Sequence, residues 1–173
     1  MPKPISQTFH FCPQCGTKPS SFGATPFKCG NCDFGVYFGP VAAVGGIIAN
    51  DAGEILFLVR GREPCKGKFG VPGGFVDVGE TLENSLIREV MEETSLVVTN
   101  LEYLCSFPNT YAYRAVAVDV LDAFYICNVE SFDSLKAQPG EVESFHIAHP
   151  TEKVLSNMAF ASNRSAIELF LKR

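Results

Sequence analysis

The stretch "GGFVDVGETLENSLIREVMEETSL", residues 73–96, decides the fold of this chain. It joins a glycine pair, Gly73 and Gly74, to a segment whose apolar residues recur at helical spacing from about Leu82 to Glu93. The same segment is rich in glutamate, and like charges at helical spacing repel one another. Either this face of the helix is simply exposed to water, or something positive binds to it.

The predicted helix has an apolar face and an acidic face. At about 100° per residue, the two groups of side chains fall on separate arcs. The apolar arc holds Leu86, Ile87, Val90, Met91 and Thr94, and the acidic arc holds Glu89, Glu92 and Glu93. Carboxylates this close raise one another's pKa values, and a hard divalent cation relieves the repulsion. Oxygen ligands suit Mg²⁺ or Mn²⁺, so we predict a cation site here.

Residues around the helix start can complete or brace this site. Gly73 and Gly74 follow Pro72 and allow the loop to fold back closely, so that a backbone carbonyl can join the same ion. Glu80 lies near the helix start, and Arg88 lies two turns further on. We expect these two side chains to pair and to hold the loop against the helix.

The whole stretch resembles the signature of the Nudix hydrolase family, in which a glycine, a glutamate, an Arg-Glu pair and a Glu-Glu pair stand at set distances. The matching residues here are Gly74, Glu80, Arg88, Glu89, Glu92 and Glu93. Ser95 occupies the position of the final glycine of the signature. Because that position closes the helix, the serine concerns the C-cap rather than the metal chemistry.

The resemblance implies an α/β fold, the Nudix α/β/α sandwich with a mixed sheet, over residues 39–173. It also implies hydrolysis of a nucleoside diphosphate linked to another moiety, with Mg²⁺ or Mn²⁺ polarising the pyrophosphate and activating water. By the same resemblance Glu89 and Glu93 are metal ligands, Glu92 is a ligand or the general base, and Glu80 and Arg88 are structural. Family members often add a glutamate from a later loop. Glu141 is the candidate and Glu143 the fallback, although Glu141 can equally be an ordinary exposed acid.

Four of the seven cysteines lie in the first 32 residues as two Cys-x-x-Cys pairs. The pairs are Cys12 with Cys15 and Cys29 with Cys32. Two such turns can present four thiolates to one tetrahedral zinc ion, and a closed site of this kind is structural. We therefore predict a zinc ribbon over residues 1–38. The alternative is two unrelated pairs, one of them redox-active.

A ribbon directly before a Nudix domain is similar to the NADH pyrophosphatase branch of the family. That branch usually carries a Ser-Gln-Pro-Trp-Pro-Phe-Pro segment after the signature, whereas this chain has no tryptophan and only "CSFPNTYAYR" at residues 105–114. Tyr111 and Tyr113 can stack on a base or anchor the loop to the core. The resemblance suggests NADH, ADP-ribose or FAD as substrate, two monophosphates as products, and a homodimer.

Composition narrows the function further. The net charge of −5 and the pI near 5.2 argue against a large nucleic-acid surface. No apolar run is long enough for a signal peptide or a membrane span, so we expect a cytoplasmic protein without membrane association. The alternative function is a non-catalytic nucleotide sensor or nucleic-acid-binding module. Such a module would have lost motif acids, and all of them are present here.

The remaining segments alternate between strand and helix patterns. We expect strands at 41–49, 54–59, 97–107, 115–129 and 142–148, a hairpin turn at 50–53, a loop at 107–114, and helices at 151–157 and 162–173. This mixture of strands and helices indicates an α/β or α+β sandwich.

Overall fold

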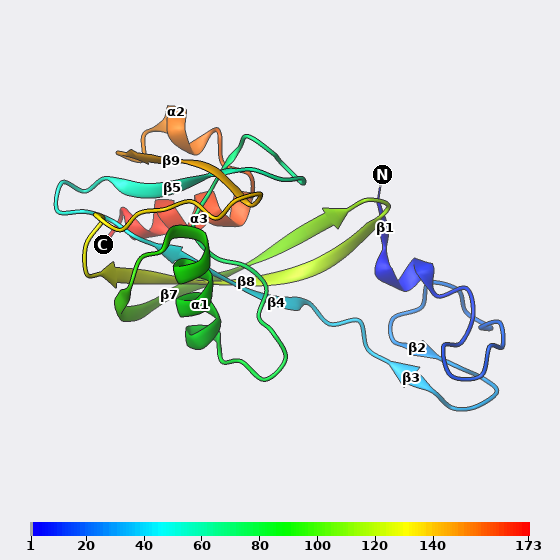
Figure 1. Ribbon diagram of the computed structural model, residues 1–173. Helices are drawn as coiled ribbons and strands as arrows, with labels where there is room; N and C mark the ends of the chain where they lie inside the picture. Colours follow the sequence, from blue (N-terminus) through cyan, green and yellow to red (C-terminus); the bar gives the residue numbers. More distant parts are fainter. Residues whose placement is uncertain (1) are drawn as a thin grey trace. The chain divides into compact units, whose positions relative to one another are not determined.

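The computed structural model describes residues 2–173, apart from the side chain of Tyr113 (Figure 1). The chain forms two compact units. One comprises Met1–Val41 with Thr110–Val120, and the other comprises Ala42–Asn109 with Leu121–Arg173. The division that we predicted between residues 38 and 39 stays a prediction. Residues 110–120 belong with the N-terminal unit in the structure, whereas the predicted N-terminal domain did not include them.

The first unit is built from very short elements. These are β1 (Lys3–Pro4), the 3-10 helix η1 (Ile5–Thr8), β2 (Phe27–Lys28) and β3 (Gly35–Val36). β2 and β3 form an antiparallel pair with Phe27 opposite Val36, and β1 runs parallel to the start of β8 with Lys3 opposite Val116. The buried residues of this unit's core cluster are Cys12, Phe27 and Cys29. A core this small cannot hold a fold together without a further constraint.

The second unit carries most of the regular structure. Its strands are β4 (Val41–Ile47), β5 (Ile55–Arg60), β6 (Phe69–Gly70), β7 (Val98–Tyr113), β8 (Val116–Val129) and β9 (Val142–Ala148), of which β4, β7 and β8 extend into the first unit. Its helices are α1 (Leu82–Thr94), α2 (Glu152–Leu155) and α3 (Ala161–Phe170). β8 lies beside β4 and β7, and β5 lies between β6 and β9, antiparallel to both.

The predicted hairpin turn between β4 and β5 is confirmed. Gly53 N–H donates to the Asn50 carbonyl at 2.9 Å, and Gly53 has a φ of 76°. The Asn50 side-chain oxygen also accepts from the backbone N–H of Ala52 at 3.0 Å and of Glu54 at 2.9 Å. An asparagine that bonds to its own turn in this way stabilises the connection between the two strands on either side of it.

Neighbouring residues along the central strands belong to two different cores. Ile48 and Leu56 pack in one cluster with Leu86 and Val90 of α1. Ile47, Ile55 and Phe57 pack in the other cluster with Ala166 and Ile167 of α3 and Leu155 of α2. Because side chains alternate between the two sides of a strand, α1 and α3 cover opposite faces. The predicted α/β/α sandwich is therefore confirmed.

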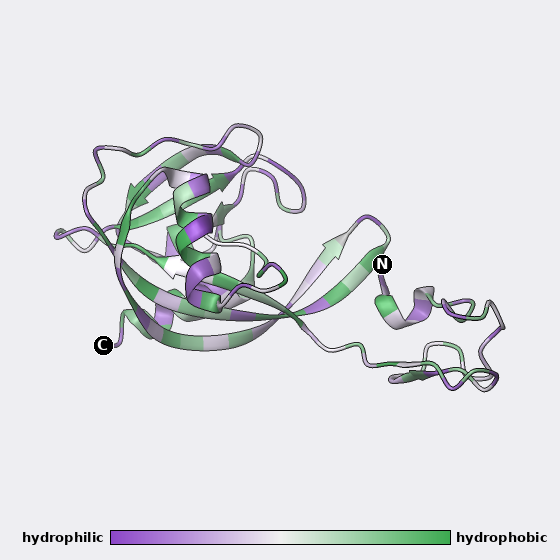
Figure 2. Ribbon diagram, turned by 60° about the horizontal axis from the view of Figure 1, so that its bottom comes forward, coloured by the Kyte–Doolittle hydropathy of each residue, from purple (hydrophilic) through white to green (hydrophobic). Residues whose placement is uncertain are grey.

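Helix α1 begins and ends with defined caps, and hydrophobic and hydrophilic residues both recur along its length (Figure 2). Thr81 is the N-cap, and its hydroxyl accepts from the Asn84 N–H at 3.2 Å. The helix ends one residue later than predicted, at Thr94, where Ser95 adopts a left-handed conformation with φ 60°. Ser95 N–H closes the last turn by donating to the Met91 carbonyl at 2.9 Å.

Ser95 is a position where glycine should stabilise the protein. A left-handed backbone costs a residue with a Cβ on the order of 1 kcal/mol relative to glycine. We expect Ser95→Gly to raise the melting temperature by roughly 2–4 °C, measured by calorimetry, since 1 kcal/mol corresponds to about that shift in a chain of this size. Ser95→Ala keeps the Cβ and should show no such gain. A lower melting temperature for the glycine variant would contradict the cap assignment.

The predicted loop at residues 107–114 is wrong, because β7 continues through it to Tyr113. Its aromatic and threonine residues suit a strand. β8 is the sheet partner of β7 among the described strands, and a strand with one free edge tolerates a proline such as Pro108. Asn109 ties the two strands together by donating to the buried carboxylate of Asp122 at 2.9 Å.

Among residues 2–173, no helix is long and apolar enough to cross a membrane.

Candidate functional site

The Gly73-Gly74 loop is packed between β4 and α1 with no room for a side chain. Gly46 N–H donates to the Pro72 carbonyl at 2.8 Å, and Val44 N–H donates to the Gly74 carbonyl at 2.9 Å. A Cβ on Gly73 would lie 2.1 Å from the Val44 carbonyl oxygen, and one on Gly74 would lie 2.5 Å from Oε1 of Glu89. The glycine pair therefore brings backbone directly against the helix carboxylates. The Gly74 carbonyl keeps a second lone pair for another partner.

Two of the motif carboxylates are half-buried at this loop. Glu93 accepts a hydrogen bond from Gly73 N–H at 2.8 Å. Burial raises the pKa of Glu93 to about 8, and the charges of Glu89 and Glu141 act in the same direction. The pKa of Glu89 is also raised by burial, against the opposing effect of Arg88. Ionised carboxylates are unfavourable in this position, and a bound cation would relieve that cost.

Arg88 connects the helix to the loop that precedes it. Its Nε donates to Glu80 Oε1 at 2.9 Å and its Nη2 donates to Glu80 Oε2 at 3.0 Å. The Nη1 atom donates to Glu89 at 2.8 Å and to Glu92 at 3.4 Å. Asp77 N–H also donates to Glu80, at 3.2 Å. The expected pair of Glu80 and Arg88 is thus present, and it holds the loop at residues 77–80 against α1.

The Glu80 pair makes a specific prediction about acid stability. Hydrogen bonds from Arg88 lower the pKa of Glu80 from its ordinary 4.5 to about 2. A depressed carboxyl pKa contributes stability above the unfolded value, and this stability is lost as pH falls through the folded value. We expect the melting temperature of the wild type to fall between pH 4.5 and 2 partly for this reason, and Glu80→Gln to show a smaller fall over that range. Equal slopes for both proteins would contradict the assignment.

A β-bulge lies beside Glu141, whose charge acts on these carboxylates. The register of β5 and β9 pairs Val59 with Ser144 but Arg60 with Val142, so Glu143 is the extra residue on β9. Gly61 N–H then donates to the Glu141 carbonyl at 2.7 Å. The charge of Glu141 contributes to the raised pKa values of Glu89 and Glu93, whereas Glu143 is exposed. Bulges are often found beside active sites, and this one lies two residues from Glu141.

The carboxylates do not already converge on one point. In the part of the chain that is described, no three acidic side chains place their oxygens within 4.8 Å of one another. Arg88 holds Glu89, Gly73 N–H holds Glu93, and Arg62 holds Glu141 at 2.6 Å. The donor set itself suits a hard divalent cation, because it consists of carboxylate oxygens and a backbone carbonyl. Side-chain rotations would be needed to bring them together.

Two arginines near this site, Arg60 and Arg62, were not predicted as site residues from the sequence. The positive charge of Arg60 opposes the raised pKa of Glu93, which places it near that carboxylate. Arg60 is itself held by a hydrogen bond to the Pro64 carbonyl at 2.9 Å and lies over the Phe160 ring at 5.1 Å. Arg62 follows two residues later and is exposed. The sequence signal was the pair of arginines flanking Gly61, directly after a buried strand.

Tyr111 and Tyr113 belong to the last residues of β7. Tyr111 is a half-buried residue of β7 within the first compact unit, while the glutamates belong to the second unit. Tyr113 ends β7, and its side chain lies outside the described part of the chain. Their role in stacking on a base stays a prediction.

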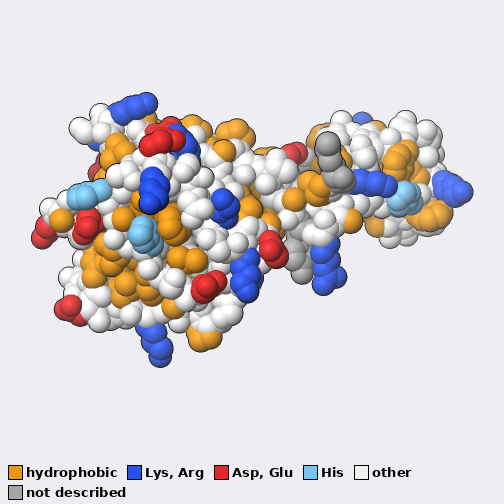
Figure 3. All heavy atoms as spheres, turned by 90° about the horizontal axis from the view of Figure 1, so that it is seen from above, with side chains coloured by type: hydrophobic (Ala, Val, Ile, Leu, Met, Phe, Trp, Pro, Cys, Tyr) orange, Lys and Arg blue, Asp and Glu red, His pale blue; other side chains and the backbone are white. Residues whose placement is uncertain are grey.

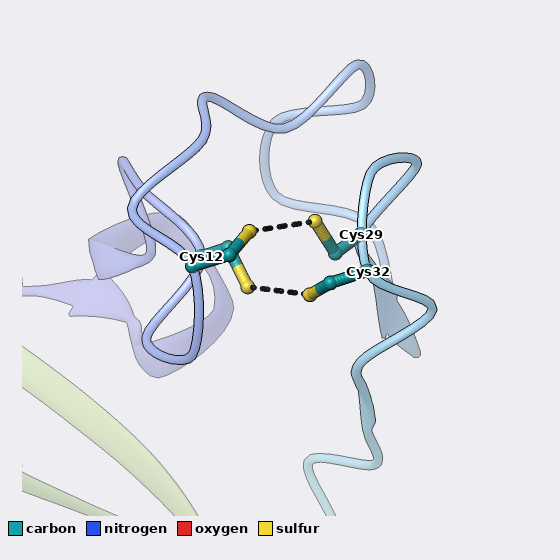
Figure 4. Close-up of side chains that lie close together, drawn as sticks. Cys12, Cys29 and Cys32 are labelled. Carbon is teal, nitrogen blue, oxygen red and sulfur yellow. Dashed lines mark hydrogen bonds between the residues drawn. The ribbon is translucent and has the colours of Figure 1, made fainter.

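The four cysteines of the first unit form a compact cluster. Cys12, Cys15, Cys29 and Cys32 place their sulfurs within 4.8 Å of one another. The Sγ atoms of Cys12 and Cys32 are 3.7 Å apart, those of Cys15 and Cys29 are 3.6 Å apart, and the two turns face each other (Figure 4). Gly16, with φ 74°, closes the first turn by donating to the Cys12 carbonyl at 2.9 Å. Four converging thiols are the donor set of a soft metal ion.

Comparison with known proteins agrees with this geometry. The NUDIX domain model matches residues 39–170. An ADP-ribose pyrophosphatase of Methanocaldococcus jannaschii is 48% identical over 62 residues, which is 36% of this chain and 36% of that protein. The NAD-capped RNA hydrolase NudC of Vibrio cholerae is 37% identical over 105 residues, which is 60% of this chain and 38% of that protein. The chain thus matches little more than a third of the length of these relatives.

Solved structures show the same fold. A NUDIX hydrolase from Nitrosomonas europaea superposes with a TM-score of 0.68 at 22% identity, covering 94% of this chain and 90% of that chain. The NUDIX domain of Shewanella oneidensis NrtR, solved with ADP ribose, gives a TM-score of 0.63 at 25% identity, covering 78% of this chain and 88% of that chain. The domain match over residues 39–170 shows that this chain belongs to the Nudix hydrolase family, and the packing of the α1 glutamates against the Gly73-Gly74 loop agrees with it.

Proposed function

We propose that the chain is a metal-dependent pyrophosphohydrolase. It would cleave a nucleoside diphosphate linked to another moiety, of the NADH, ADP-ribose or FAD type, into two monophosphates. The observation that carries this proposal is the contact of Glu89 and Glu93 with the Gly73-Gly74 loop, where both carboxyl groups have raised pKa values. The relatives named as an ADP-ribose pyrophosphatase and as NAD-capped RNA hydrolases support the same class of substrate.

The residues would divide the work as follows. Glu89, Glu93, the Gly74 carbonyl and Glu141 would hold Mg²⁺ or Mn²⁺, with Glu92 as a further ligand or as the general base. A divalent cation bound there supplies Lewis acidity toward the diphosphate and lowers the pKa of water. Arg88 and Glu80 would keep α1 and its loop in register. Glu92, which is exposed on the helix, can accept a proton from an attacking water.

We propose zinc for the cluster of four cysteines. Four thiolates complete a tetrahedral shell and leave no open position, so this ion would be structural. Backbone and side-chain N–H groups of Asn31 lie 3.4 Å from the sulfur of Cys29 and 3.7 Å from that of Cys15. Such donors stabilise thiolates, as in other metal sites whose ligands carry supporting hydrogen bonds.

A panel of substrates tests the proposed activity. The full chain would be incubated with Mg²⁺ or Mn²⁺ and ADP-ribose, NADH, FAD or an NAD-capped RNA oligonucleotide, and the products would be separated by chromatography. We expect AMP or another nucleoside monophosphate from at least one of them. If the zinc-loaded chain turns over none of the four with either metal, the proposal is wrong.

The second candidate is a nucleotide sensor or nucleic-acid-binding module. It is favoured by the likeness to the NrtR domain that was solved with ADP ribose. The presence of Glu80, Glu89, Glu92 and Glu93 favours the enzyme instead. Calorimetric binding of ADP-ribose without hydrolysis, or a salt-dependent gel shift with nucleic acid, would reverse this order. The resemblance also suggests a homodimer, which light scattering tests.

A further inference from the structure

We infer that Arg62 is a positioning residue that holds Glu141 away from the cation site until a substrate diphosphate takes its guanidinium. The inference rests on the proposed function. It concerns a pair of side chains at the end of the β5–β9 pairing, on the side of the molecule that carries α2 and β9. Figure 3 views that side, where basic and acidic side chains lie near one another.

The pair is close but easily separated. Arg62 Nη2 lies 2.6 Å from Glu141 Oε2, and the two side chains are 59% and 30% exposed. Ion pairs between solvent-exposed groups contribute little to stability, so exchanging one partner for another costs little. The backbones, in contrast, are tied by the 2.7 Å hydrogen bond from Gly61 N–H to the Glu141 carbonyl. An exchange would therefore move side chains and leave β5 and β9 in place.

Arg62 differs from the other arginines beside the site. Arg60 is held by the Pro64 carbonyl and by the Phe160 ring, and Arg88 is held by Glu80 through two hydrogen bonds. Among the described contacts, Arg62 has Glu141 as its single charged partner. It is thus the arginine of the three that can turn to a ligand without breaking the fold.

Charge explains why a diphosphate would displace Glu141. A guanidinium binds phosphate oxygens through two parallel hydrogen bonds, and a diphosphate carries more charge than one carboxylate. The charge of Glu141 raises the pKa values of Glu89 and Glu93. A rotation of its side chain away from Arg62 would be needed to bring its carboxylate to theirs. Once released from Arg62, its carboxylate completes the oxygen donor set. Substrate arrival and completion of the cation site are then linked.

Because of this linkage, Arg62→Ala should strengthen the binding of Mn²⁺ and weaken the binding of substrate. Without nucleotide, the variant frees Glu141 and should bind Mn²⁺ roughly threefold more tightly, a shift of the size expected from losing one exposed ion pair. With substrate, it lacks the phosphate contact and should show a KM at least about tenfold higher, with kcat changed much less. A residue that only supported the fold would weaken both.

Mn²⁺ titration of the full chain, followed by electron paramagnetic resonance without nucleotide, tests the first effect. The variants are Arg62→Ala, Arg62→Lys, Glu141→Gln and the double variant Arg62→Ala with Glu141→Gln. The double variant should bind Mn²⁺ as Glu141→Gln does, because Arg62 acts through Glu141. Arg62→Lys should give an intermediate KM, since it keeps the charge but loses the paired hydrogen bonds. Arg164→Ala removes a half-buried arginine that pairs with Glu152 and Glu168, and serves as the matched control.

Unchanged or weaker Mn²⁺ binding by Arg62→Ala overturns the inference, and so does an unchanged KM. If no nucleotide is hydrolysed by the wild type, the proposed function fails. The Mn²⁺ titrations still decide whether Arg62 restrains Glu141, so the two failures are distinguishable.

Discussion

Replacing Glu93 by glutamine is expected to lower kcat by about a thousandfold or more. The substitution removes a charge from the half-buried position against Gly73, while an amide oxygen can still accept the Gly73 hydrogen bond. Losing roughly 4 kcal/mol of transition-state stabilisation, within the range supplied by a bound metal, lowers a rate by about that factor. Steady-state kinetics on the best substrate of the panel measures it.

The control for this variant lies on the same helix. Glu83 accepts a hydrogen bond from the Tyr125 hydroxyl at 2.9 Å and belongs to the first turn of α1. Glu83→Gln should keep kcat within about twofold, because this carboxylate is not among the proposed ligands. Wild-type turnover by Glu93→Gln, or an equal loss in both variants, would show that the site is wrongly assigned.

Glu93→Gln, which should lower kcat, should also stabilise the fold at higher pH when divalent ions are chelated. The pKa of Glu93 is raised to about 8 in the folded chain, from an ordinary value of 4.5. The stability that this protonated carboxyl contributes is therefore complete below pH 4.5 and is lost as pH rises to about 8. Glutamine does not ionise, so the melting temperature of Glu93→Gln relative to wild type should rise over this range and then level off.

Removal of the metal from the cysteine cluster should have the second large effect. We expect Cys12→Ser to lose the zinc ion and to unfold the first unit. The core cluster of that unit has three buried residues, Cys12, Phe27 and Cys29, and two of them are proposed zinc ligands. Structural zinc contributes on the order of 10–16 kcal/mol to small domains of this kind, far more than so small a core can replace.

Metal analysis and calorimetry together measure this loss. The wild type should contain about one zinc ion per chain, and Cys12→Ser should contain almost none. The second unit has two large clusters of its own, built on α1 and on α3, and should keep a separate unfolding transition. Cys105→Ser, in β7, is the control and should retain zinc. A wild type that contains no zinc after expression in zinc-supplemented medium, and a Cys12→Ser variant with unchanged melting, would each contradict the assignment.

The features that could be predicted from the sequence are those that depend on residues close together along the chain. The helix α1, the turn at Asn50 and the Cys-x-x-Cys turns each depend on neighbours within a few residues, and each is present. The predicted apolar face of α1 is only partly buried, because Leu86, Val90 and Thr94 are buried whereas Ile87 and Met91 are exposed. The pair of Glu80 and Arg88 was also predictable, because Glu80 stands directly before the N-cap Thr81 and Arg88 lies about two turns further along the chain.

Features that depend on contacts between segments far apart in the sequence could not be predicted from the sequence. The bulge at Glu143 depends on how β9 aligns with β5, and a shift of one residue leaves no mark on composition. The extended form of residues 107–113 depends on pairing with β8, against the turn preference of Pro108 and Asn109. From the sequence, Gly74 was interpreted only as a residue whose backbone carbonyl could bind the cation. The structure shows that it must also lack a side chain, because Glu89 packs where its Cβ would be.

The parallel pairing of Lys3 and Pro4 with Val116 and Ala117 affects how the protein can be shortened. A version that starts at residue 39 would remove β1 from β8 and leave main-chain N–H and C=O groups at the start of β8, in the hairpin that β8 forms with β7, without partners. Such bare edges recruit strands from other molecules. Any self-association of that fragment would then reflect the exposed edge of β8 rather than native assembly. A safer truncation would also remove the end of the β7–β8 hairpin together with the N-terminus.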